Sequence, residues 1–379
     1  MNKPGVIVLG GHVQALGIIR AFGRLGIKSV IIENTPKNIS RHSKYCSKHY
    51  VVSDDKLLSF LRKLGNDNQY KNWLIFPTND FHVKILSQNK KNLEQYFKVT
   101  TDEWQTIKLF YNKKESYRLA KKLNIPIAKT FFPKNETDLE QIDISYPCIV
   151  KPAVMYDFLN QVKKKVFVCK NQNELIQNYR KACSLIPPDE VIIQNIIKGP
   201  SNNQFSACFL FLNGEAYVSL TATRMRQHPL DFGNATTYAE TVDIPTLKEY
   251  AQKILKASNY NGICEVEFKK DETDGEYKFL EVNTRTWKWH AIAKKAGTPF
   301  LETYYDYLNG ESIKKNNGQK HASFRHSLTD VYVQLQLLLK GHSYALRKKS
   351  PTVKAVLNVK DIKPWLFEKF YLFYLIKSR

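Results

Sequence analysis

The stretch Ile263–Arg285, "ICEVEFKKDETDGEYKFLEVNTR", decides how the rest of the chain is interpreted. Two runs of alternating residues flank the turn-rich segment "DETDG", a pattern that is typical of a β-hairpin. Successive strand side chains point to opposite faces, and the polar face of the second run carries Glu281, Asn283 and Arg285. Because burying an unpaired charge in a core is costly, we expect this face to line a polar site.

The first run of the hairpin contributes further carboxylates to the same face. If the turn is centred near Asp274, Glu267 comes opposite or diagonal to Glu281, and Glu265 competes with Glu267 for that place. Adjacent carboxylates repel unless a cation lies between them. Mg²⁺ prefers oxygen ligands, which Glu267, Glu281 and the amide oxygen of Asn283 would supply. The pattern alone leaves open an exposed sheet face with solvated charges.

The N-terminal region reads as a βαβ unit, "GVIVLGGHVQALGIIRAFGRLGIKSVIIE". Val6–Leu9 and Ser29–Ile32 are β-rich, and the residues between Ala15 and Leu25 have helical periodicity. The glycines do not form G-x-G-x-x-G, and Glu33 alone is weak evidence for a dinucleotide site. We expect a small open parallel sheet, with an α/β pattern that continues to about residue 110.

The charge balance is strongly basic. The net charge is +23, and residues 314–379 hold 14 Lys or Arg against 3 Asp or Glu. Nucleic acid, an anionic membrane surface or a phosphorylated substrate could each account for this excess. No module with basic residues interleaved with stacking aromatics is recognisable, so a specific nucleic-acid partner is not expected.

Cysteine usage and apolar runs indicate the compartment. The six cysteines include no Cys-x-x-Cys pair, so neither a disulfide framework nor a zinc site is predicted. The chain begins directly with a strand pattern, and its longest apolar run, Phe370–Ile376, is well short of the ~18 residues that cross a bilayer. A cytoplasmic location is expected.

Several segments together resemble the ATP-grasp superfamily. "EVEFKKD" followed by "FLEVNTR" resembles its metal-binding hairpin, and "NKKESYRLAKKLNIP" resembles the segment that carries a first nucleotide-binding lysine, here Lys113. "YPCIVKPA" resembles the strand of the second such lysine, Lys151, and "IIQNIIKG" resembles the hinge that grips adenine. These motifs follow one another in the family's order over residues 1 to about 310.

The resemblance implies ATP and Mg²⁺ as cofactors, with Mn²⁺ as an alternative metal. It implies that the metal ligands are Glu267, Glu281 and Asn283. The implied nucleotide contacts are Lys113, Lys151, Lys165, Gln194, Asn195, Ile196 and Ile197. For Lys165 a solvated strand end is the alternative reading.

The same resemblance implies an α/β fold of the α+β ATP-grasp type in four parts. Residues 1–110 would form a Rossmann-like pre-ATP-grasp domain, as in carboxylate-amine ligases and carbamoyl-phosphate synthase. Residues 111–195 would form the small lid subdomain and 196–313 the C-terminal subdomain with the metal-binding hairpin. Residues 314–379 would be a basic helical extension.

Two departures from the family pattern bear on function. Many members place an acid at the hinge for the ribose hydroxyls, whereas this chain has Gln194 and Asn195. The loop after Lys151, "PAVMYDFLNQVKKK", lacks the glycine run that biotin carboxylase uses as a phosphate lid. The second departure disfavours that relative.

The implied activity is an ATP-dependent ligase for a small-molecule carboxylate and an amine. The carboxylate would be activated as an acyl phosphate, in the modification of an amino acid, a peptide or a cell-surface glycan precursor. Arg285 would lie near the reacting phosphate, and Arg224 and Arg226 share one strand face suited to an anionic substrate. Surface arginines are the alternative for the latter pair. An ATP-grasp carboxylase and a non-catalytic nucleotide-binding protein are the rival functions.

The C-terminal segment "PWLFEKFYLFYLIKSR", residues 364–379, is aromatic and basic. It suits a membrane interface, with a location at the inner face of the membrane, and equally a helix docked on the protein's own surface. The resemblance is also compatible with a homodimer.

Overall fold

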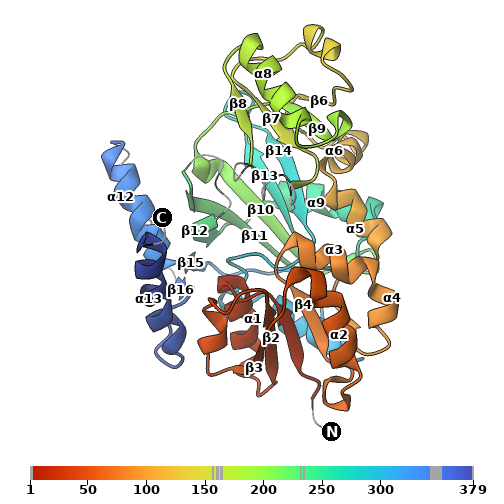
Figure 1. Ribbon diagram of the computed structural model, residues 1–379, viewed down its shortest axis with the longest axis vertical. Helices are drawn as coiled ribbons and strands as arrows, with labels where there is room; N and C mark the ends of the chain where they lie inside the picture. The colour runs from red at the N-terminus through yellow and green to blue at the C-terminus, as the bar shows by residue number, and fades with distance from the viewer. Residues whose placement is uncertain are drawn as a thin grey trace.

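In the computed structural model of the protein, the described residues are 3–155, 158, 162, 165–230, 233, 235–341 and 352–377. They form three sheets with helices packed around them (Figure 1). The N-terminal unit lies at one end of the molecule, a small four-stranded sheet lies at the other, and the largest sheet runs between them.

The N-terminal unit is a parallel sheet in the order β3-β2-β1-β4-β5. Its strands are β1 (Val6–Leu9), β2 (Ser29–Glu33), β3 (Cys46–Val51), β4 (Leu74–Pro77) and β5 (Lys98–Val99). The accompanying helices are α1 (Val13–Gly23), α2 (Leu57–Gly65), α3 (Asp80–Gln88), α4 (Lys90–Leu93) and α5 (Trp104–Tyr111). The predicted βαβ start is confirmed. In such sheets the crevice where the strand order reverses, here between β1 and β4, is the usual ligand edge.

The glycine turn after β1 is tightly constrained. Gly10 has a φ of 111°, and a side chain there would collide with Thr78 at the end of β4. The Gly11 amide donates to Glu33 Oε2 at 2.6 Å. The Glu33 carboxylate therefore closes its own turn, which is a structural use of this residue.

The small sheet is antiparallel in the order β6-β9-β7-β8. Its strands are β6 (Thr130–Phe131), β7 (Cys148–Pro152), β8 (Phe167–Cys169) and β9 (Val191–Asn195), and α8 (Gln172–Cys183) packs on it. Helix α6 (Lys113–Lys122) leads into this unit and is capped by Asn112, whose side chain accepts from the Lys114 amide at 2.9 Å. The cap fixes Lys113 at the first position of the helix.

The large sheet has the order β14-β13-β10-β11-β12-β15-β16. Its strands are β10 (Gln204–Leu212), β11 (Glu215–His228), β12 (Ala235–Thr241), β13 (Gly262–Lys270), β14 (Tyr277–Asn283), β15 (Ser323–Arg325) and β16 (Thr352–Lys354). Its helices are α9 (Pro245–Ala257), α10 (Ile292–Lys295) and α11 (Phe300–Leu308). Phe209, Phe268 and Phe279 belong to one buried cluster with α5, α6 and α9, so the apolar strand faces hold the hairpin in place.

The C-terminal region is more than a helical appendage. Besides α12 (Ser327–Leu339) and α13 (Lys363–Lys377), it supplies β15 and β16 to the edge of the large sheet. The prediction of a purely helical extension was incomplete because β15 and β16 are only three residues each, too short for a period of two to stand out.

This extension is anchored on the N-terminal unit. Arg20 on α1 donates to Asp361 Oδ2 at 2.8 Å, and Ser43 and the Lys44 amide donate to the same carboxylate. The ring of Phe367 on α13 stacks on His42 with centroids 3.3 Å apart. Figure 1 shows α12 and α13 on the same flank of the molecule, with α12 above α13 in this view. No helix in the described part of the chain is long and apolar enough to span a bilayer.

Candidate active site

The hairpin of β13 and β14 forms in the predicted register. Glu267 pairs directly with Glu281, and Glu265 pairs with Asn283. Directly opposite residues of an antiparallel pair have Cβ atoms about 5 Å apart, so the polar side chains gather on one face. The alternation that predicted this face is confirmed, including the placement of Glu267 across from Glu281.

Glu265 and Glu267 form one hydrogen-bonded group with Asn283. The Asn283 amide nitrogen donates to Glu265 Oε2 at 3.2 Å and to Glu267 Oε1 at 3.0 Å. Ser206 also donates to Glu265, and Gln204 donates to Glu267. Burial, with Glu265 2% exposed, and then the neighbouring Glu267 carboxylate raise the pKa of Glu265 to about 8.

Glu281 on β14 interacts with Lys113 at the start of α6 and with Lys165, which precedes β8 (Phe167–Cys169). Lys113 at the start of α6 donates to Glu281 and forms an ion pair with it. Burial alone would raise the pKa of Glu281, but Lys113 and then Lys165 outweigh this and keep it below its ordinary value. Burial lowers the pKa of Lys165, against the pull of Glu281 and Glu267. The first and third predicted nucleotide lysines therefore meet the predicted metal carboxylates.

Lys151 at the end of β7 lies in a polar pocket of the small sheet. Its ammonium donates to the Gln194 side chain at 2.7 Å and to the Tyr117 hydroxyl at 2.8 Å. Gln194 in turn donates to Thr130 at 2.7 Å. The Gln194 side chain is thus used to position Lys151, while Asn195 accepts a bond from the Ser145 amide at 3.3 Å.

These groups line one cavity of about 380 Å³, which we call the nucleotide cleft. It lies between the small sheet and the hairpin, and its walls hold all seven predicted nucleotide contacts together with Glu281. The seven are Lys113, Lys151, Lys165, Gln194, Asn195, Ile196 and Ile197. Residues from α6, β7, the hinge and β14 therefore converge on a space of the size of a small-molecule site.

Arg285, the residue two positions beyond Asn283, is fixed from three sides. It donates to Asp80 Oδ1 at 2.7 Å, to Asn283 Oδ1 at 3.2 Å and to the Thr286 carbonyl at 3.1 Å. Asp80 is the first residue of α3, at the carboxyl end of β4. The ligand edge of the parallel sheet thus contributes directly to the hairpin site.

Comparison with known proteins was made against family models, curated proteins and solved structures. The family model described as carbamoyl-phosphate synthase L chain, ATP binding domain, matches residues 223–315 of this chain. The D-aspartate ligase of Enterococcus faecium strain Aus0004 is 24% identical over 303 residues, which cover 74% of this chain and 70% of the ligase.

Solved structures extend the likeness over most of the chain. The biotin carboxylase domain of Hydrogenobacter thermophilus 2-oxoglutarate carboxylase, with MgADP, ADP and bicarbonate, matches with a TM-score of 0.65 and 17% identity. That match covers 83% of this chain and 73% of the other. The L-amino acid ligase of Bacillus licheniformis matches with a TM-score of 0.63 and 15% identity, over 81% and 75% of the two chains.

The chain has the ATP-grasp fold. The fold class predicted from the hairpin and the lysine motifs is thereby confirmed. The four domain boundaries and the roles of individual site residues stay predictions.

Among the predicted substrate arginines of this ATP-grasp chain, Arg224 lies beside the carboxylates. It donates to Glu267 Oε1 at 3.2 Å, and its side chain contacts Gln227 and the Gly233 carbonyl, two residues that line the nucleotide cleft. Its Nε is buried without a hydrogen-bond partner among the described residues. Arg224 therefore retains a free donor next to the cleft.

Arg226 points into a different environment, and the prediction that it shares a strand face with Arg224 is wrong. A register shift between the two arginines pairs them with Ala239 and Tyr238, which are adjacent on β12 and face opposite sides. Its guanidinium makes a bidentate ion pair with Asp330 on α12, at 2.7 and 2.9 Å, and lies over the Tyr238 ring at 4.3 Å. Arg325 also donates to Asp330, at 2.7 Å. The contacts of Arg226 are those of a structural ion pair between the sheet and the extension.

Several residues that complete the site were not predicted from the sequence. They are Asp80, which holds Arg285; Tyr117, which contacts Lys151; and Gln204 and Ser206, which donate to Glu267 and Glu265. Asp80 had a recognisable signal, because it follows a buried parallel strand at its carboxyl end. The others lie within helix or strand patterns that predict packing only.

The donor set of the hairpin fits a hard divalent cation. Glu267, Glu281 and Asn283 present oxygen atoms on one face, and in this structure Lys113 and Arg224 provide the positive charge beside them. Within the described ranges no group of three His, Cys, Asp or Glu is arranged to hold a metal ion. A metal here would therefore depend on the two carboxylates, the amide oxygen and oxygens of the nucleotide.

Proposed function

We propose that this ATP-grasp protein is an ATP-dependent ligase that joins a small-molecule carboxylate to an amine. The observation that carries the proposal is the convergence of three lysines and Glu281 on the nucleotide cleft, with Glu267 paired across from Glu281. All the named relatives are ATP-grasp ligases, synthases or carboxylases, which supports the enzyme class.

The lysines would bind the phosphates of ATP. Lys113 at the start of α6 and Lys165 just before β8 both act on Glu281, so their charges are concentrated where polyphosphate would lie. The burial that lowers the pKa of Lys165 would be relieved by an anionic phosphate nearby. Lys151, held by Gln194 and Tyr117, provides a third fixed donor.

Glu267, Glu281 and Asn283 would hold Mg²⁺. When bound, the ion neutralises phosphate charge and orients the transferred group. The present partners of these side chains, Lys113 and Arg224, then become available to contact phosphate or substrate. The crystal structure of the Hydrogenobacter carboxylase domain contains MgADP, which supports this assignment.

The reaction follows from bringing two anions together. An oxygen of the substrate carboxylate attacks the γ-phosphorus, the bond to the β,γ-bridging oxygen breaks, and ADP leaves with an acyl phosphate remaining. The amine nitrogen then attacks the acyl carbon, phosphate leaves with the bonding pair, and the amine proton passes to solvent or phosphate. Arg285, which donates to Asp80, and Arg224, whose Nε has no partner among the described residues, would stabilise the charge of these groups.

The experiment is a hydroxylamine trap. The protein is incubated with Mg-ATP, hydroxylamine and single carboxylates from a panel of amino acids, dipeptides and sugar acids, and hydroxamate and phosphate are measured. Hydroxamate with one carboxylate is expected for the wild type and is expected to be lost in Glu281→Gln. Glu276→Gln is the matched control, because Glu276 is exposed in the hairpin turn.

The outcomes separate the rival functions. Phosphate release that depends on bicarbonate, without hydroxamate, would indicate a carboxylase, as in the Hydrogenobacter relative. Nucleotide binding without phosphate release under any condition would indicate a nucleotide-binding protein and contradict the proposal.

The remaining features of the assignment are also proposals. A small-molecule carboxylate and amine are the expected partners, and both a homodimer and a cytoplasmic location are consistent with the chain. Membrane contact through residues 364–379 stays a prediction. The described part of α13 contacts the protein itself, through Phe367 with His42 and through Glu368 with His326.

A further inference from the structure

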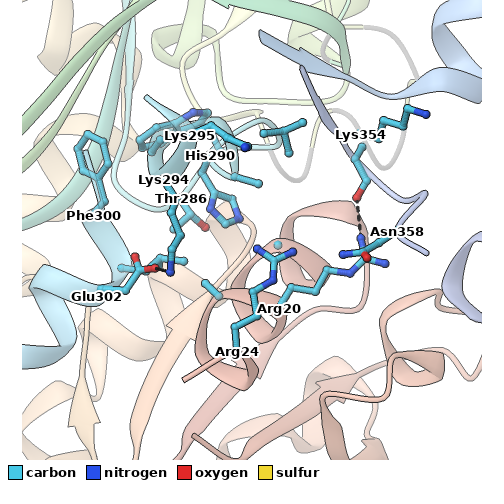
Figure 2. Close-up of a pocket in the computed structure, with 18 of the residues that line it drawn as sticks. Arg20, Arg24, Thr286, His290, Lys294, Lys295, Phe300, Glu302, Lys354 and Asn358 are labelled. Carbon is cyan, nitrogen blue, oxygen red and sulfur yellow. Dashed lines mark hydrogen bonds and ion pairs between the residues drawn. The ribbon is translucent and has the colours of Figure 1, made fainter. Parts of the chain in front are cut away.

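A second cavity, which we call the basic cavity, lies apart from the nucleotide cleft (Figure 2). Its volume is about 500 Å³, within the range of small-molecule sites. Helix α1, the segment that follows the hairpin, helix α11 and residues 352–358 of the C-terminal extension form its walls. Among the described residues the two cavities share no lining side chain.

Positive charge converges on this cavity from three separate parts of the chain. The basic side chains in its lining are Arg20 and Arg24 on α1, Lys294 and Lys295 on α10, and Lys354 on β16. Figure 2 labels all five residues around the cavity, with the Lys354 side chain extending away from Arg24. The acidic residue in the described lining is Glu302, which is 2.8 Å from Lys294.

Three of these cations are not neutralised. Arg20 is engaged by Asp361 and by the carbonyls of Ala355 and Val356. Arg24, Lys295 and Lys354 have no carboxylate partner in the part of the chain that the structure describes. Like charges that face one concave space repel one another, and this repulsion favours the binding of an anion.

The inner wall of the cavity is apolar. Trp287 is 2% exposed and packs edge to face on Phe300, with centroids 5.5 Å apart. Both residues line the cavity, so the organic part of a bound molecule would meet an aromatic surface.

We propose that the basic cavity is a second binding site, distinct from the nucleotide cleft, for a small molecule that carries phosphate groups. Arg24 and Lys295 bind the phosphates, for which guanidinium and ammonium groups are suited. The organic part of the molecule lies on the wall of Trp287 and Phe300. The site does not depend on the proposed ligase activity, because its residues lie outside the cleft.

Calorimetric titration of the full chain tests this. The nucleotide cleft is first saturated with Mg²⁺ and a non-hydrolysable ATP analogue, which also reports on the proposed function. Inorganic pyrophosphate and AMP are then titrated as probes. Saturable binding of at least one probe is expected in the wild type, with AMP binding more tightly if the apolar wall contributes.

The variant R24E/K295E is expected to weaken probe binding at least tenfold while leaving the first titration unchanged. K63E/K71E is the control, because it makes the same change of charge at exposed positions outside both cavities. Trp287→Leu should weaken AMP binding several-fold by removing the aromatic ring from the wall, while pyrophosphate binding stays unchanged. No saturable binding at concentrations of about 1 mM, or equal loss in R24E/K295E and K63E/K71E, would overturn the proposal.

Discussion

Two ion pairs of this protein have the same chemistry and opposite surroundings. One is Lys113–Glu281 in the nucleotide cleft, and the other is Arg226–Asp330, which joins the large sheet to α12 and which we call the C-terminal joint. In the cleft, Lys113 pairs with Glu281, and both side chains keep part of their surface in contact with solvent. In the joint, Asp330 is completely buried and accepts bonds from Arg226, Arg325, Thr237 and Gln334. A ligand can replace Lys113 or Glu281 as the partner of the other. Both oxygens of the Asp330 carboxylate, in contrast, already accept hydrogen bonds from the protein.

The position of an ion pair, at a cavity wall or fully buried, therefore separates binding charges from structural charges in this basic protein. A pair whose partners lie at a cavity wall can exchange them for phosphate or metal at little cost. A fully satisfied buried pair loses several kcal/mol when one partner is removed, because the other charge is left uncompensated. Substitutions in the two regions should therefore affect different observables.

The largest effect is expected at Lys113. Lys113→Ala should reduce phosphate release by a thousandfold or more, about 4 kcal/mol, because it removes a charge that stabilises the transferred group. The unfolding free energy should change by much less. Steady-state kinetics and urea unfolding measure the two quantities. A large loss of stability with normal turnover of the folded fraction would contradict the comparison.

Asp330 should show the reverse behaviour. Asp330→Asn is expected to lower the unfolding free energy by about 3 to 5 kcal/mol. It replaces a buried carboxylate that pairs with Arg226 and Arg325 by a neutral amide, which leaves both guanidinium charges uncompensated. Turnover per folded molecule should be nearly unchanged.

The same variant tests the substrate role predicted for Arg226. If Arg226 binds substrate, Asp330→Asn should raise KM for the carboxylate substrate, and Arg226→Gln should do the same. Stability loss without a KM change would assign Arg226 to the joint alone.

How much of this could be predicted from the sequence depends on the distance between partners along the chain. The register of Glu267 and Glu281 follows from strand alternation around a short turn. The pairs Arg285–Asp80 and Arg226–Asp330 join residues 205 and 104 positions apart. A β-bulge between Arg224 and Arg226 breaks the strand periodicity, so the alternation predicts neither the face of Arg226 nor the helix that covers it.

The ion pair of Arg20 with Asp361 illustrates the same limit. Arg20 lies on an α1 pattern that predicts only an amphipathic helix, and Asp361 lies 341 positions further on. Neither residue has a local signal for the other. The basic cavity, whose walls combine α1, α10 and β16, could not be predicted for the same reason.

A smaller effect is expected from pH. Burial lowers the pKa of His290 to about 4, although the bond that its Nε2 donates to the Gln14 carbonyl opposes this shift. The unfolded state, with an ordinary histidine pKa near 6.5, binds more protons between pH 6.5 and 4. Stability from this group is therefore present above pH 6.5 and lost as the pH falls toward 4, by about 1.4 kcal/mol per unit.

Unfolding free energies at pH 6.5 and 4.5 measure this contribution. His290→Gln should show a shallower loss than the wild type over the same interval, whatever its stability at pH 6.5. Equal slopes would show that His290 does not titrate in this range.

The smallest effect concerns α13. Phe367 stacks on His42 and is 37% exposed, whereas Phe370 on the same helix is 78% exposed. Phe367→Ala should loosen the helix by about 1 kcal/mol, the size of an aromatic pair, and Phe370→Ala should not. Amide hydrogen exchange of residues 363–371 measures this with the global stability as reference.

Binding of the same variants to anionic vesicles distinguishes the two roles proposed for α13. If only Phe370→Ala lowers vesicle binding while hydrogen exchange is unchanged, the exposed face contacts the membrane and the stacked face anchors the helix. If neither variant changes vesicle binding, docking on the N-terminal unit is the whole role of the helix.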